Sequence, residues 1–325
     1  MFKFSIGNGI GVRFGRNTLL FDPNVSDFIS FISHAHADHS PFGFVTKPYC
    51  TPETYELIRL RDPYFEANVV EENKKIKFDD FSVILLSAGH VLGSVQVYVE
   101  ADGGSIVYSG DFKLAKSFTC KPIRIKEADI LVMESTYGRS EYSFPKIEDL
   151  RKNIIQWVTD QLKNKFFVEI GAYQIGKSQE AIKILNESGI IPNVSETIRR
   201  YSEIYKRFGI YLKFLEPNEN SNILVKPIHL LRERNNVKTC ALTGWSIENN
   251  KGMERPRPYF GFPLSDHADF NDILEYVRLV NPKKVYCVHG YTHELAKVIK
   301  KKLKIPAKPL DSPIDLLQQK LLTDF

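Results

Sequence analysis

The chain has 325 residues, of which 43% are hydrophobic and 26% are charged. This length and composition predict an ordinary globular protein with a substantial core, arranged as two domains. Lysine and arginine outnumber aspartate and glutamate by 44 to 39, a mildly basic balance that is compatible with a polyanionic partner but does not identify one.

The cysteines are widely scattered and include no C-x-x-C pair, which argues against a disulfide framework or a zinc finger. The pattern favours reduced, partly buried thiols in a cytoplasmic protein. The amino terminus lacks the apolar stretch of a signal peptide, and no apolar run approaches the ~20 residues that span a bilayer. We therefore expect a soluble cytoplasmic protein with no membrane partner. The four cysteines are Cys50, Cys120, Cys240 and Cys287.

The first segment of the chain predicts a β-hairpin and a third strand. Residues 1–23 alternate apolar and polar side chains around Gly7, Gly9 and Gly11, and the last strand ends in Asp22 before a proline. At the edge of a metal site, Asp22 can orient a metal-bound histidine through a hydrogen bond. A turn-initiating aspartate before proline explains the same residue equally well.

The next segment predicts a metal site. The apolar run 28–32 reads as a buried strand, and it leads into the hexapeptide His34-Ala35-His36-Ala37-Asp38-His39. In extended backbone His34 and His36 point to the same side and can share one ion, whereas Asp38 and His39 lie in the turn beyond and can serve a second ion. A chance cluster is a poor alternative, because the whole chain holds only eight histidines. The hexapeptide therefore indicates a metallo-enzyme.

Polar residues recur where the following strands are predicted to end. His90, Asp111 and Glu134 each lie at or just after such a strand end. This recurrence is expected if one edge of a sheet carries all the ligands. The predicted elements are a short helix over 52–60 and strands over 81–86, 94–99, 105–108 and 129–134.

From about residue 145, long helical patterns alternate with short strands. The stretch 147–163 is amphipathic, with one continuous apolar face. The alternation predicts a small α/β domain inserted into the first one. Its predicted elements are helices over 147–163, 178–185 and 197–208 and a strand over 166–170.

The inserted segment contains a formal match to the phosphate-binding loop G-x-x-x-x-G-K-[ST], from Gly171 to Ser178, between a strand and a helix. A nucleotide site would also need a magnesium-holding aspartate at the end of a second strand, and the remaining sequence offers no convincing one. We favour another ligand for the same loop. A helix amino terminus beside Lys177 attracts any phosphate, including one in a nucleic-acid backbone.

The last third of the chain resembles the first third in placing histidines next to predicted strands and helices. His267 precedes a predicted helix over 272–280, and His289 follows a predicted strand over 284–288. His229 and His293 lie outside such positions and are interpreted as ordinary polar residues. Another strand is predicted over 237–242, followed by a basic loop that contains Lys251, Arg255 and Arg257.

Taken in order, these residues resemble the metallo-β-lactamase superfamily and, within it, the β-CASP nucleases, named for the cap domain that interrupts their hydrolase fold. Glu134 in "MESTYG", His267 in "SDHAD" and His289 in "VHG" are similar to three further motifs of that family, and "YQIGKSQEAI" matches its cap-domain signature. The stretch "GW … GFPLSDHADF … VHGY" is most similar to a small exonuclease group. That group includes bacterial ligase-associated DNA exonucleases and archaeal messenger-RNA 3′-end processing factors.

The resemblance implies an α/β fold and extends over nearly the whole chain. Residues 1–140 and 261–325 would form a metallo-β-lactamase αββα sandwich. Residues 141–260 would form a smaller α/β β-CASP cap inserted into it. This cap is shorter than in the large RNA-processing members, and no separate RNA-binding domain is visible in the sequence.

The resemblance also implies a two-zinc site. Imidazole and carboxylate ligands suit Zn²⁺, and by ligand type Mn²⁺ is an alternative. Besides Asp38, the catalytic residues would be Glu134 and His267, with Glu134 orienting His267 as the general acid. One zinc ion would take His34, His36 and His90, the other Asp38, His39 and His289, and Asp111 would bridge them. Contacts to substrate phosphates would come from Gly176, Lys177, Ser178, Arg255 and Arg257.

The implied function is a metal-dependent nuclease, expected to be an exonuclease of RNA or DNA processing, that hydrolyses phosphodiester bonds of single-stranded RNA or DNA. A small-molecule hydrolase of the same superfamily, such as a thioesterase or lactonase, is an alternative, but it leaves Glu134, His267 and the cap without a role. A second alternative is an inactive nucleic-acid-binding subunit, although such proteins lose ligands and here every ligand position is filled. RNA against DNA, the cleavage polarity and the oligomeric state stay open.

Overall fold

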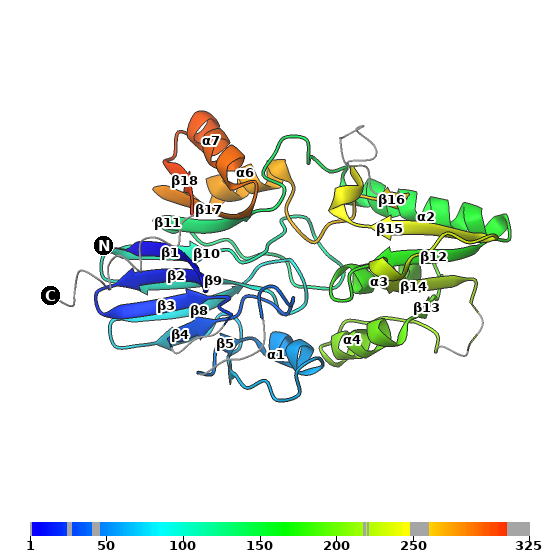
Figure 1. The fold of residues 1–325 in the computed structure, drawn as a ribbon, viewed down its shortest axis with the longest axis horizontal. Coiled ribbons are helices and arrows are strands. Elements are labelled where there is room, and N and C mark those ends of the chain that lie inside the picture. Colours follow the sequence, from blue (N-terminus) through cyan, green and yellow to red (C-terminus); the bar gives the residue numbers. More distant parts are fainter. Residues whose placement is uncertain are drawn as a thin grey trace.

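The computed structural model describes residues 2–24, 28–40, 46–216, 219, 221–247 and 260–310. In this part of the chain, two sheets stack into a sandwich and a third sheet forms a separate lobe beside it (Figure 1). The sandwich combines strands from both ends of the chain, and the lobe comes from the middle. This is the expected metallo-β-lactamase arrangement with an inserted α/β cap, and we call the two parts the sandwich and the cap.

The first sheet of the sandwich is built from consecutive strands. Its first three strands are antiparallel, and the later ones pair in parallel. The predicted hairpin and third strand are thereby confirmed. In order across the sheet the strands are β1 (Lys3–Gly7), β2 (Gly9–Phe14), β3 (Asn17–Phe21), β4 (Ile29–Phe31), β5 (Tyr49–Cys50) and β6 (Asn68–Val69).

The second sheet joins the beginning of the chain to its end. Strand β11 pairs in parallel with β17, so the chain that returns from the cap completes the sheet. The order across the sheet is β18 (Ala307–Pro309), β17 (Lys284–Gly290), β11 (Ile130–Ser135), β10 (Gly104–Tyr108), β9 (Val95–Ala101), β8 (Phe81–Ser87) and β7 (Lys75–Lys77).

The core of the sandwich lies between these two sheets. Phe21 and Phe31 from the first sheet pack with Val97 and Tyr108 from the second in one buried cluster, and Phe21 stacks on Tyr108 with ring centroids 4.8 Å apart. Strand β8 is buried at six of its seven positions, which explains its continuous apolar sequence.

Helices complete the αββα layering. Helices α6 (Phe270–Val280) and α7 (Thr292–Leu303) cover the outer face of the second sheet and bury Ile273, Val277 and Ile299 there (Figure 1). On the side of the first sheet, α1 (Pro52–Arg59) begins at the N-cap Thr51 and packs Leu57 against Ile32. Helix α7 has no counterpart among the sequence predictions.

The cap is a parallel sheet with helices. Helix α2 (Ile147–Lys163) and strand β15 (Val237–Leu242) have the bounds predicted for them. Strand β16 (Gly261–Phe262) pairs with β15, so the cap sheet extends two residues past the expected boundary at residue 260. The sheet order is β13 (Asn193–Val194), β14 (Ile223–Pro227), β12 (Phe167–Ala172), β15 and β16, with helices α3 (Lys177–Glu187) and α4 (Glu196–Arg207).

The cap is held against the sandwich by a buried carboxylate. Glu180 of α3 accepts hydrogen bonds from the hydroxyls of Ser117 and Thr119, at 2.7 and 3.2 Å, and from the backbone N–H of Phe118 at 2.9 Å. It also pairs with Arg151 of α2 at 2.6 Å. Because Glu180 is 1% exposed, these contacts satisfy a charge that would otherwise be costly to bury.

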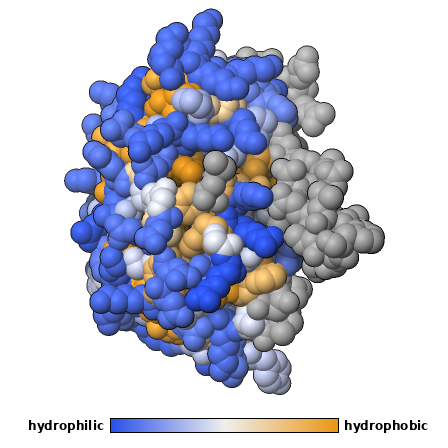
Figure 2. Space-filling view, turned by 90° about the vertical axis from the view of Figure 1, so that its left-hand side faces the viewer, coloured by the Kyte–Doolittle hydropathy of each residue, from blue (hydrophilic) through white to orange (hydrophobic). Residues whose placement is uncertain are grey.

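None of the helices in the described ranges has the length and apolar character needed to cross a bilayer. Figure 2 views the molecule from the sandwich end, where hydrophilic residues predominate and apolar side chains show between them.

Candidate metal centre

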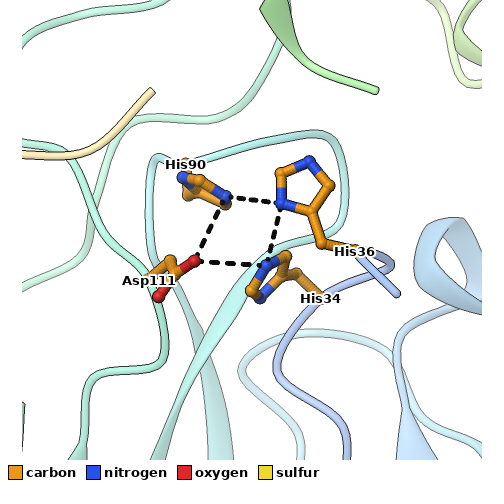
Figure 3. A group of neighbouring side chains, drawn as sticks. All are labelled: His34, His36, His90 and Asp111. Carbon is orange, nitrogen blue, oxygen red and sulfur yellow. Dashed lines mark hydrogen bonds and ion pairs between the residues drawn. The ribbon is translucent and has the colours of Figure 1, made fainter. Parts of the chain in front are cut away.

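Three imidazoles and a carboxylate converge on one point between the sandwich and the cap (Figure 3). His36 Nδ1 lies 3.1 Å from both His34 Nε2 and His90 Nε2. Asp111 Oδ2 lies 3.4 Å from His34 Nε2 and 3.7 Å from His90 Nε2. Ligands at 2.0–2.1 Å in a tetrahedral zinc site are about 3.3–3.4 Å apart. The four atoms therefore fit one zinc ion.

Each of these residues is delivered by the end of a strand. The hexapeptide follows β4, His90 follows β8 and Asp111 follows β10. Gly110 lets Asp111 approach, because its φ of +52° favours glycine and a Cβ there would lie 2.7 Å from the Cβ of Ser33. The predicted recurrence of histidine and aspartate side chains at the ends of strands is thus seen in three dimensions.

In every histidine of this cluster, the nitrogen that faces away from the centre has a partner. His90 Nδ1 donates to the carbonyl of Asp266 at 2.9 Å, and His36 Nε2 donates to the carbonyl of Ile175 at 3.2 Å. His34 Nδ1 donates to the hydroxyl of Ser33 at 2.9 Å. Such partners set the tautomer and aim the other nitrogen at a metal. Ile175 belongs to the cap, so the cap helps to orient His36.

The Asp22 carboxylate joins several of the residues that surround the cluster. Its Oδ2 accepts hydrogen bonds from the hydroxyls of Ser33 and Tyr108, at 2.6 and 2.7 Å, and from His39 Nδ1 at 2.8 Å. Its Oδ1 accepts the backbone N–H of Ser33 at 2.6 Å. The predicted hydrogen bond between Asp22 and a candidate metal-binding histidine is confirmed, with His39 as the donor. Through Ser33, Asp22 also orients His34.

Burial keeps the cluster in a form that can bind metal. Burial, reinforced by neighbouring imidazoles, lowers the pKa of His34 and His90 well below the ordinary histidine value. Burial and the Lys177 ammonium lower the pKa of His36. Neutral imidazole is the form that coordinates metal, so protons do not compete for these three ligands at neutral pH.

The residues expected to hold a second ion lie next to the first cluster but converge less tightly. His39 Nε2 is 3.5 Å from Asp111 Oδ2 and 3.9 Å from an Asp38 oxygen, and Asp38 is 81% exposed. The rings of His39 and His289 have centroids 5.3 Å apart. His289 is exposed and has a φ of +53°. Asp111 Oδ2 is thus close to both groups, as the expected bridging ligand would be.

The charge around His39 differs from that around the first three histidines. Burial alone would lower its pKa, but the carboxylates of Asp111, Asp22 and Asp38 outweigh burial and raise it to about 10. A metal ion that uses His39 must therefore displace a proton.

Glu134 and His267 form a close pair beside the cluster. His267 Nδ1 lies 2.8 and 3.1 Å from the two Glu134 oxygens and 3.9 Å from Asp111 Oδ2. Glu134 is fully buried and also accepts the N–H of Phe112 and the hydroxyl of Thr136. Burial disfavours a charged His267, but the charges of Glu134 and Asp111 outweigh it and raise its pKa. For Glu134, the opposite charge of His267 outweighs burial and lowers its pKa.

These groups open into a cavity of about 360 Å³ between the sandwich and the cap. Five of its lining residues were given no role in the sequence analysis, namely Thr136, Tyr137, Tyr173, Thr243 and Trp245. Of these, Thr136 and Tyr137 lie inside the quoted "MESTYG" stretch and Tyr173 lies inside the phosphate-loop match. Tyr173 is 45% exposed and its ring lies 4.7 Å from Lys177 Nζ. The cavity is lined by His36, Ala37, Asp38, His39, Asp111, Thr136, Tyr137, Tyr173, Lys177, Thr243, Trp245, His267 and His289.

The loop that matched the phosphate-binding pattern has its donors turned inward. The Gly176 N–H donates to the Gln179 side chain at 2.8 Å, and both the N–H and the hydroxyl of Ser178 donate to the carbonyl of Tyr173. Gly176 has a φ of +89°, and a Cβ there would lie 2.6 Å from Asp266 Oδ2. The loop therefore serves close packing of cap against sandwich.

Lys177 reaches the cavity but is not a free cation. Its Nζ pairs with Asp266 Oδ2 at 3.1 Å, and both side chains are almost fully buried. Of the other residues expected to bind substrate, Arg255 and Arg257 lie outside the described residues, as does Lys251. His229 and His293 are exposed and do not line the cavity.

Comparisons with known proteins agree with this geometry. Residues 261–308 match the family described as the Zn-dependent metallo-hydrolase RNA specificity domain. The chain is 30% identical over 288 residues to a probable DNA ligase of Opitutus terrae. This match covers 84% of this chain and 28% of the ligase. It is 27% identical over 369 residues to an RNase J-like protein of Methanocaldococcus jannaschii, with 85% of each chain covered.

Two further likenesses concern the fold and the nuclease relatives. The chain is 24% identical over 336 residues to RNase aCSPSF2 of Saccharolobus solfataricus, covering 80% of this chain and 68% of that protein. A crystal structure of a protein of unknown function from Enterococcus faecalis superposes with a TM-score of 0.63 at 15% identity. It covers 95% of this chain and 96% of that one, and at this identity it supports the fold alone.

Proposed function

Because this chain belongs to the β-CASP group of the metallo-β-lactamase superfamily, we propose that it is a zinc-dependent nuclease that hydrolyses phosphodiester bonds of single-stranded RNA or DNA. The observation that carries the proposal is that the candidate metal centre and the Glu134–His267 pair lie at one cavity. A ligand set with tetrahedral spacing lies beside a buried carboxylate and histidine that a small-ester hydrolase would not need.

One ion would be held by His34, His36 and His90 together with Asp111. The second would be held by Asp38, His39 and His289, with Asp111 shared between the two groups. When bound, a pair of zinc ions supplies a hydroxide nucleophile at neutral pH and polarises a phosphoryl oxygen. The outer hydrogen bonds from Asp22, Ser33 and Ile175 keep the ligand nitrogens aimed inward.

Glu134 determines which atom of His267 can act. The Glu134 carboxylate has a lowered pKa and accepts hydrogen bonds only, so Nδ1 of His267 carries the donated proton. Nε2 is then the nitrogen available to the cavity. A protonated His267 can give its Nε2 proton to the oxygen that leaves when the phosphodiester bond breaks.

The relatives support nucleic acid over a small ester as the substrate, since those compared above include two named as RNases. The matched domain is described by RNA specificity. The choice between RNA and DNA is part of the test, because the ligase relative is named for a DNA reaction and this chain spans only 28% of it.

The test is digestion of RNA and DNA oligonucleotides of matched sequence, each labelled at one end or the other. We expect cleavage of single strands that stops after chelation and returns with Zn²⁺, and the product ladder gives the polarity. Thioester and lactone substrates are assayed in parallel. Hydrolysis of these esters with intact oligonucleotides, or fewer than two ions per chain with no turnover, would contradict the proposal.

A further inference from the structure

A second cavity, of about 220 Å³, is lined in part by His267. His267 also lines the cavity at the metal cluster, so the two cavities adjoin at the proposed general acid. The walls of the second cavity are made where the chain enters the cap and where it leaves. The lining residues are Lys113, Ala115, Phe144, Pro145, Lys146, Ile147, Leu150, Pro263, Ser265, His267, Asp269 and Asp272.

Lys113 is the unusual residue of this cavity. It is 4% exposed, and within the described part of the chain its Nζ has no hydrogen-bond partner. Its backbone is held in place, because the Lys113 N–H donates to the carbonyl of Ala88 at 3.0 Å. A buried ammonium without a partner costs several kcal/mol, so this arrangement favours an anion that enters the cavity.

Neither carboxylate that lines the cavity accepts a hydrogen bond from Lys113 Nζ in the described part of the chain. Both oxygens of Asp269 accept backbone N–H groups, from Asp272 and from Phe144, each at 2.8 Å, in capping helix α6. Asp272 also lines the cavity, but it is not a hydrogen-bond partner of Lys113 Nζ, for which the described residues supply none. Burial and the charge of Asp269 raise the pKa of Asp272 to about 6, although the nearby charge of Lys113 opposes this shift.

We propose that Lys113 binds a second phosphate of the substrate strand, one nucleotide away from the phosphate that faces His267. The inference rests on the proposed function and names a subsite for it. A strand repeats its phosphate at every nucleotide, so a strand that crosses His267 brings a second phosphate into the adjoining cavity. The ligand class is a phosphate anion, and the contact is a charge-assisted hydrogen bond from Nζ.

The first experiment tests whether the charge of Lys113 and the charge of one substrate phosphate act together. Single-stranded oligonucleotides carry one neutral methylphosphonate linkage, moved stepwise along both sides of the cleaved bond. For the wild-type protein we expect KM to rise about tenfold or more at one position. In Lys113→Met this position loses its effect, with kcat and zinc content unchanged. In the control Lys297→Met, an exposed residue of α7, the effect persists.

Folding gives an independent readout. Methionine has similar length and suits an apolar wall, so Lys113→Met should be at least as stable as the wild type in urea. A methylphosphonate effect that is equal in wild type and Lys113→Met at every linkage would overturn the proposal.

Binding of inorganic phosphate by calorimetry separates this inference from the proposed function. Even if no oligonucleotide is cleaved, the zinc-loaded wild type should show a phosphate-binding component that Lys113→Met lacks. Asp272→Asn should strengthen that component about threefold or more, because it removes a nearby carboxylate. Equal binding by wild type and Lys113→Met, or weaker binding by Asp272→Asn, would rule out an anion site in this cavity.

Discussion

Lys177 of the cap and Asp266 of the returning chain form a buried ion pair, with Nζ 3.1 Å from Oδ2, at the edge of the candidate metal centre. The backbone carbonyl of the same Asp266 accepts the hydrogen bond that orients His90. One residue therefore joins cap, sandwich and metal ligand, and the position of the cap is linked to the geometry of the site.

The ion pair predicts unequal effects of single and double substitutions. Lys177→Met or Asp266→Asn alone leaves one buried group unpaired and should lower the free energy of unfolding by about 3–5 kcal/mol. The double variant Lys177→Met/Asp266→Asn should recover a large part of that loss. Urea unfolding followed by fluorescence measures all three. Additive losses would show that the two side chains do not interact.

Arg61 is expected to control metal affinity without touching a metal. Its guanidinium donates to the carbonyls of Ala35 and Ser40 at the two ends of the hexapeptide turn, and it bonds to Tyr201 of the cap. Arg61→Lys cannot make both carbonyl contacts, so zinc affinity should fall about 10–100-fold. The control is Arg59→Lys, since Arg59 donates to the carbonyl of Pro63 on the surface. Zinc titration that gives equal affinities for both variants would contradict this role.

Asp111 should decide how many ions the chain holds. Its Oδ2 is near His34, His90 and His39, so Asp111→Asn removes the charge shared by both sites. We expect two zinc ions per chain in the wild type and fewer than one in Asp111→Asn, counted by elemental analysis after dialysis. Asp102→Asn, in an exposed turn, serves as the control and should keep both ions. Two ions in Asp111→Asn would exclude the bridging role.

The pair Glu134 and His267 should act as a unit in turnover. His267→Ala should lower kcat about 10²–10⁴-fold with KM unchanged, because it removes proton transfer and no phosphate contact. Glu134→Gln should lower kcat in the same direction, and the double variant should be no slower than His267→Ala alone. Asp38→Ala should also abolish turnover while far-UV circular dichroism stays unchanged. A double variant slower than both single variants by the product of their effects would mean that the residues act independently.

The raised pKa of Asp272 predicts that the free energy of unfolding depends on pH. Its pKa is raised from 3.8 to about 6, so between these values the folded protein holds a proton that the unfolded chain has released. Stability therefore falls as pH rises through this window, and the penalty is fully present above pH 6. Asp272→Asn should raise the free energy of unfolding by ~1 kcal/mol at pH 8, after allowance for solvent screening, and by less at pH 5. An equal gain at both pH values would contradict it.

The local pattern of the sequence was sufficient for much of the site. The i, i+2 spacing of His34 and His36 predicts a shared ion, because extended backbone places both side chains on one face. The helix over 147–163 was predicted with its final bounds, since its apolar residues repeat at helical period. Helix α7 was missed because three consecutive lysines at its end obscure the apolar stripe of Leu295 and Ile299.

Other features depend on contacts between distant segments. The phosphate-loop match at Gly171–Ser178 is correct as a strand, loop and helix, but only the packed structure pairs Lys177 with Asp266, 89 residues away. The same holds for the Lys113 cavity, which is bounded by the two crossings between sandwich and cap. No local pattern predicts which buried lysine finds a carboxylate and which does not.

By itself the sequence predicted the candidate ligand types, their placement at strand ends and the α/β class, because spacing and periodicity are properties of a short stretch of chain. Only the tertiary structure decided the charge around each group. It places Asp22 where its carboxylate accepts hydrogen bonds from both His39 and Ser33, and it places His36 where its ring donates to a backbone carbonyl of the cap. Burial and the orientation of partners are set by packing between segments far apart in sequence, and these two quantities control tautomers, pKa values and the reach of a cation.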